Sequence, residues 1–163
     1  MKKQKSIGNK GFSLVELIIV IAIMAILIGV MAPQLLRYVE RTRVSSDTQL
    51  ADSVRTAVRT AMMDPVVISN SNATSAIAAF NAGASTVGTA WDLSSLQGTE
   101  FGNAIAETLG VGDTALGTVA SNLQSTPAGA GSMTIAVWSN NGNDVGVIIR
   151  NSDDGTGSAI VVE

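Results

Sequence analysis

A long apolar run near the N-terminus constrains this chain more than any other feature. Between Phe12 and Ala32 the only ionisable residue is Glu16. The run is close to the ~20 residues that a helix needs to cross a bilayer. A carboxylate at membrane depth is costly, and it marks a functional site or a partner. The sequence therefore predicts a membrane-spanning helix in which Glu16 has a specific role.

The segment before this run is basic. It contains no acid and four lysines, which are Lys2, Lys3, Lys5 and Lys10. The positive-inside rule places that end in the cytoplasm. An ordinary secretory signal has a shorter apolar core and a small-residue cleavage site after that core. Here the candidate small residue, Gly11, precedes the core, and no obvious A-x-A site follows it.

The sequence GFSLVELIIVIAIMAIL at residues 11–27 resembles the class III signal of type IV pilins and of the pseudopilins of type II secretion systems. That motif has a glycine at the cleavage site, an aromatic residue as the new N-terminus and a glutamate four residues later. These occur here as Gly11, Phe12 and Glu16. The resemblance covers roughly residues 1–63. It implies that residues 1–11 are a leader cut off by a prepilin peptidase, which also N-methylates Phe12.

The chain contains no cysteine and no histidine. Disulfides and thiolate metal sites are therefore excluded, as is nucleophilic catalysis that needs histidine. Many exported pilins close their C-terminal region with a disulfide, and this chain departs from that pattern. We expect a structural protein without a cofactor rather than an enzyme.

Charge is distributed unevenly. Without residues 1–11, six arginines stand against thirteen acids, a net charge of about −7. Nine of those acids follow residue 60, where Arg150 is the only basic residue. Five arginines lie shortly after the apolar run: Arg37, Arg41, Arg43, Arg55 and Arg59. The acidic C-terminal part is not expected to bind nucleic acid directly, because such binding rests largely on neutralised phosphates.

Residues 12–63 are predicted to form one long helix in two parts. Residues 12–33 are the apolar membrane and assembly part, in which Gly29 and Pro33 predict a kink or local melting. Residues 34–64 are amphipathic, and Asp64 before Pro65 is a plausible stop. The apolar stripe consists of Leu50, Val54, Ala57, Val58, Ala61 and Met62. Two ion pairs are expected on the exposed face: Glu40–Arg43 and Asp52–Arg55.

Residues 65–163 are predicted to form a globular head. We expect ordered loops with short helical pieces over 66–98 and 110–132, with Trp91, Leu93, Leu96 and Trp138 in the core. A helix over 100–109 would be capped by Thr99 and ended by Gly110. Strands are predicted at 133–138, 145–150 and 158–163, separated by turn-rich NNGN and NSDDGTG. The fold class is α+β, with the long helix packed on an antiparallel meander, and residues 38–163 should fold alone.

Two places could carry chemistry. After cleavage, the carboxylate of Glu16 could pair with the Phe12 ammonium of a neighbouring subunit; alternatively it faces a channel or is tolerated near the membrane surface. Asp153 and Asp154 offer hard oxygens that calcium prefers, although an ordinary acidic turn explains them better. No other carboxylate is assigned a role.

The resemblance implies a structural subunit that polymerises into a type IV pilus. It would wait in the inner membrane as a precursor and end in an extracellular filament. Its partners would be other copies of itself, the prepilin peptidase, and the assembly platform with its motor. The alternatives are a pseudopilin of a type II secretion system and a membrane-tethered binding domain that does not polymerise.

Overall fold

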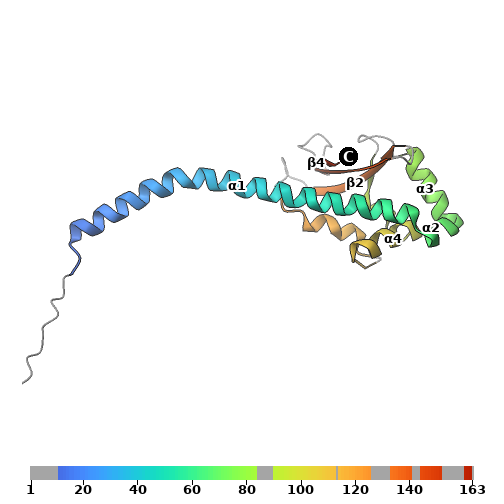
Figure 1. The fold of residues 1–163 in the computed structure, drawn as a ribbon, viewed down its shortest axis with the longest axis horizontal. Coiled ribbons are helices and arrows are strands. Elements are labelled where there is room, and N and C mark those ends of the chain that lie inside the picture. Colours follow the sequence, from blue (N-terminus) through green and yellow to red (C-terminus); the bar gives the residue numbers. More distant parts are fainter. Residues whose placement is uncertain are drawn as a thin grey trace, which may run out of the picture. The chain divides into compact units, whose positions relative to one another are not determined.

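The computed structural model describes residues 11–83, 90–112, 114–125, 133–140, 144–151 and 160–162. The chain divides into two compact units, Met1–Val39 and Glu40–Glu163. The long helix α1 (Leu14–Met63) contributes to both units (Figure 1). The predicted α+β class, a long N-terminal helix packed against an antiparallel sheet, is confirmed.

The first unit contains the apolar half of α1. Every residue from Gly11 to Val39 is exposed, so aliphatic side chains face outward all round the helix. Among the described residues, α1 is the only helix long and apolar enough to cross a membrane. Its backbone is helical through Gly29 and Pro33. The expected kink or loosening at those two residues stays a prediction.

The second half of α1 packs into the head. Its buried apolar residues are Ala51, Val54, Ala57, Val58 and Ala61, while Leu50 and Met62 are partly buried against the same core. The predicted stripe is therefore confirmed. The helix ends at Met63, as Asp64 before Pro65 indicated. Asp64 also begins the short helix α2 (Pro65–Ser69), because its carboxylate accepts a hydrogen bond from the Val66 amide at 2.8 Å.

The sheet is antiparallel with the strand order β1-β2-β3-β4. The three predicted strands are present as β2 (Met133–Asn140), β3 (Asp144–Asn151) and β4 (Ile160–Val162). The sequence reading missed β1 (Trp91–Asp92), a two-residue strand that pairs with β2. In the central pair, Ile135 lies opposite Ile149, which places β-branched side chains together in the core.

Four further helical segments belong to the described part of the head. They are α3 (Ser71–Gly83), the 3₁₀ turns η2 (Leu93–Leu96) and η3 (Leu116–Asn122), and α4 (Glu100–Leu109). The helix predicted over 100–109 is confirmed, as are the Thr99 cap and the left-handed Gly110 at its end. The expectation of only short helical pieces over 66–98 was wrong for α3, a helix of 13 residues. Its alanines and serines give little amphipathic signal.

Aromatic rings join these segments to the sheet. Phe80 of α3 contacts Trp91 edge-on and Phe101 at a tilt, each with ring centroids 5.9 Å apart. Trp138 of β2 is buried and lies opposite Gly146 of β3. A side chain on Gly146 would overlap the Trp138 indole. Glycine is therefore needed there for close packing, because the space of its side chain is filled by the ring.

We predict that Gly146→Ala destabilises the head. The added methyl group must displace a packed indole, and overpacking of this kind costs about 1–3 kcal/mol. Urea unfolding of residues 38–163 measures the change. Gly112→Ala is the matched control, since a methyl group there meets no atom within 4 Å. Equal stability of the two variants would show that Trp138 moves aside at no cost.

Candidate functional site

The N-terminus of α1 is capped by hydrogen bonds among Ser13, Glu16 and Leu17. Ser13 precedes the helix, and its carbonyl accepts the first helical hydrogen bond from Leu17 N at 3.2 Å. The Ser13 amide in turn donates to Oε2 of Glu16 at 3.0 Å. This is the glutamate half of a capping box, in which the third helical residue reaches back to the cap. The Ser-x-x-Glu spacing carried this signal, and the sequence reading did not use it.

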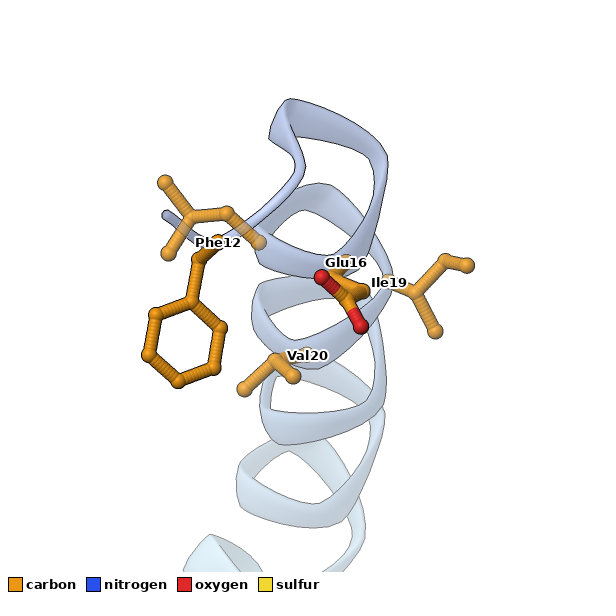
Figure 2. A pocket seen from close by; sticks show the side chains of 5 residues that line it. Phe12, Glu16, Ile19 and Val20 are labelled. Atoms are coloured by element: carbon orange, nitrogen blue, oxygen red, sulfur yellow. The ribbon is translucent and has the colours of Figure 1, made fainter. Parts of the chain in front are cut away.

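An apolar groove lies beside this turn. It has a volume of about 440 Å³ and is lined by Phe12, Glu16, Leu17, Ile19 and Val20. Figure 2 shows the Phe12 ring lying along the helix near Val20, with the Glu16 carboxylate directed out of the helix on that side. Phe12 is 93% exposed, so its ring is free to contact another molecule. The structure thus brings together the two predicted assembly residues, Phe12 and Glu16.

The groove combines an aliphatic wall with one carboxylate. A carboxylate has about four acceptor positions, and the Ser13 amide occupies one of them. Glu16 can therefore accept further donors while its capping bond is kept. A cationic group presented with apolar surface, such as an amine beside an aromatic ring, fits this combination.

Other predicted positions are not tested. The leader residues 1–10 and the calcium candidates Asp153 and Asp154 lie outside the described residues. Within the described ranges, no group of three or more acidic, histidine or cysteine side chains is arranged to hold a metal ion. Gly11 is exposed, and a side chain on it would meet no atom within 4 Å.

Comparison with known proteins finds a family match to the N-terminal segment that contains Phe12 and Glu16. Residues 8–32 match the family described as the prokaryotic N-terminal methylation motif. Type IV major fimbrial protein FimA of Dichelobacter nodosus is 42% identical over 56 residues, which cover 34% of this chain and 36% of FimA. A fimbrial protein of Moraxella nonliquefaciens is 43% identical over 53 residues, covering 32% and 34% of the two chains. No solved structure matches.

These matches confirm the resemblance drawn from the GFSLVE motif: the chain carries the N-terminal methylation motif of type IV pilins. Both relatives are named as fimbrial proteins. The chain spans about a third of the length of the curated relatives that it matches.

Two acids in the second unit, Glu40–Glu163, have partners that sequence reasoning missed. Asp144, at the start of β3, accepts hydrogen bonds from Arg55 at 3.0 Å and Arg59 at 2.6 Å. Arg55 also donates to the Val145 carbonyl at 2.7 Å. The expected Asp52–Arg55 pair was wrong, because Arg55 turns to the sheet, whereas the expected Glu40–Arg43 pair is present at 3.7 Å.

The second acid is Asp47, which is almost completely buried. Its two oxygens accept the amides of Gln124 and Ser125, both at 2.8 Å. The bonds tie the segment after η3 to α1. A signal was available, since Asp47 precedes Ala51 and Val54 at helical spacing and so lies on the buried stripe.

We predict that the Asp144 contacts stabilise the head at neutral pH and that this stabilisation is lost in acid. The hydrogen bond from Arg55, with those of Val145 and the two guanidinium charges, lowers the pKa of Asp144. A carboxyl group whose pKa is lowered by folding stabilises the folded state when the pH is above the pKa of the unfolded chain. This contribution is lost as the pH falls from there through the lowered pKa of the folded state. Asp144→Asn should therefore be destabilising at pH 7, with a difference from wild type that shrinks below about pH 4.

Thermal melts of residues 38–163 between pH 3 and pH 7 measure this difference. Asp52→Asn is the control, because Asp52 is an exposed acid that has no ion pair among the described residues. A difference between wild type and Asp144→Asn that stayed constant with pH would contradict the charge-based account.

Proposed function

We propose that this chain is a structural subunit that polymerises into a type IV pilus filament after leader cleavage. The observation that carries the proposal is the first half of α1, which exposes apolar side chains on every side and holds one carboxylate beside Phe12. Such a surface needs cover from lipid or from similar helices. The methylation motif and the fimbrial relatives agree with this reading.

Lipid covers the apolar helix of the precursor in the inner membrane. Leaving the bilayer is then favourable only when helices of several copies cover each other. The chain has no phosphate-binding loop of its own. Extraction therefore requires an assembly platform with an external motor, and the prepilin peptidase acts before it.

In the filament, the Phe12 ammonium of one copy would meet the Glu16 carboxylate of its neighbour. Burying either charge alone costs several kcal/mol, so the pair favours the register in which both charges are matched. The capping bond from Ser13 leaves acceptor positions on Glu16 for this second contact. Gly11 has open space around it, so its small size serves the peptidase rather than the packing of this chain.

We predict cleavage between Gly11 and Phe12 and N-methylation of Phe12. N-terminal mass spectrometry of sheared filaments measures both. Gly11→Leu should accumulate the uncut precursor, whereas Gly11→Ala is expected to be partly processed. Filament protein that retains Met1, or that begins after Ala32, would contradict the proposed leader. Electron microscopy of the same cells separates long surface pili from the short periplasmic filaments of a secretion pseudopilin.

We predict that Glu16→Gln lowers filament yield roughly tenfold or more, because an unpaired buried charge costs several kcal/mol. The glutamine oxygen can still accept the Ser13 amide, so the helix start is kept. Glu16→Ala loses both contacts and should be at least as defective. Immunoblots of sheared filaments measure the yield, with membrane levels of the precursor as the control. Normal yield from Glu16→Gln would assign Glu16 to helix capping alone.

A further inference from the structure

One end of the head exposes an apolar surface that no other described residue covers. Met63 at the end of α1 is 75% exposed, and Val66 and Ile68 of α2 are 70% and 56% exposed. Val67, between them, is buried and fixes the turn to the core. We call Met63, Val66 and Ile68 the apical surface. Val66 and Ile68 flank the buried Val67 on α2, and Met63 ends the preceding helix, so three exposed large apolar side chains lie within six residues of sequence. Exposed apolar surface of this kind occurs at contacts with other proteins.

The surroundings of the apical surface are acidic. Asp64 lies within the corner, and α4, which packs against α2, carries the exposed Glu100 and Glu107. Figure 1 shows α2, α3 and α4 gathered at this end of the head. No lysine or arginine occurs between residues 60 and 149. A partner for this surface should therefore combine apolar side chains with positive charge.

The other end of the head part of α1 has that combination. Val44 is 38% exposed, and Arg41, one helical turn before it, is also exposed. Arg41 has no ion pair among the described residues, while Arg43 pairs with Glu40. We call Arg41 and Val44 the basal surface. Val44 and Met63 are nineteen residues apart on α1, which corresponds to about 28 Å along the helix.

We propose that the apical surface of one copy docks on the basal surface of the next copy. The inference rests on the proposed function, since it describes how subunits of one filament meet. The two surfaces share apolar character and carry opposite charge, whereas two apical surfaces would bring acids together. A contact between unlike surfaces can repeat from copy to copy, and it forms an open helical filament when its rotation does not close into a ring. It adds to the bundling of the apolar helices and makes the order of the heads sensitive to salt.

The absence of cysteine gives a direct test in the full chain. Cells assembling Val44→Cys/Val66→Cys subunits are treated with a short thiol cross-linker, and sheared filaments are run on denaturing gels. We expect a ladder of covalent oligomers. Each single variant should give no ladder, and a mixture of the two single variants should stop at dimers. Val44→Cys/Val161→Cys is the matched control, because Val161 of β4 is similarly exposed but lies outside both surfaces.

Several results would overturn the inference. They are normal filaments without a ladder, an equal ladder from the control pair, and dimers from Val66→Cys alone. If the cysteine pair blocks assembly, Val66→Ser and Val161→Ser are compared, and equal filament lengths count against the apical surface. Absence of filaments from the unmodified chain is a failure of the proposed function instead, and it is scored before any cross-linking.

The charge contribution is tested in the same gels. Arg41→Glu in the double-cysteine background should reduce the ladder roughly tenfold, because a like charge then faces Asp64. High salt during cross-linking should reduce the ladder of the original pair in the same direction. An unchanged ladder together with loss of the precursor from anionic membranes would assign Arg41 to lipid phosphates and overturn this part of the inference.

Discussion

The rest of the structure depends on one constraint, which is that the apolar half of α1 must be shielded from water. Aliphatic side chains face outward on all sides of the helix, and each of them is exposed in the part of the chain that the structure describes. An apolar surface of this size is stable in water only when lipid or another apolar surface covers it. The head therefore needs its own core, and it has one, built from the second half of α1, the sheet and the small helices. One continuous helix thus has an exposed apolar half and a half that packs in the core of the head. The difference follows from the sequence, which changes from uniformly apolar to amphipathic after Pro33.

Local patterns in the sequence predicted most of the fold. The stripe from Val54 to Ala61, the Thr99 cap, the Gly110 end and three of the four strands depend on neighbours close in sequence. The first strand is too short to have a pattern, and its pairing with β2 depends on residues more than forty positions away. The helix α3 is composed of small and polar residues, and only its packing through Phe80 distinguishes it from a loop.

Long-range polar contacts were the other part that the sequence did not predict. Arg55 meets Asp144 across 89 positions, and Asp47 meets Gln124 across 77. Helical spacing placed Asp52 near Arg55, but an exposed pair of this kind gains only a few tenths of a kcal/mol. Strand β3 presents both the Asp144 carboxylate and the Val145 carbonyl to Arg55, so the guanidinium makes two hydrogen bonds there instead of one exposed ion pair with Asp52. Without disulfides, these contacts and the core hold the head to α1.

The position of Glu16 explains how one carboxylate can serve both states of the protein. At the third helical residue, it lies beside the positive end of the helix dipole and accepts the Ser13 amide. Both effects stabilise the carboxylate before any neighbour is present, which lowers the cost of keeping an acid in an apolar segment. A glutamate two turns further along would have neither the free amide nor the dipole. It would also lie farther from Phe12, so one position satisfies capping in the precursor and pairing in the proposed filament.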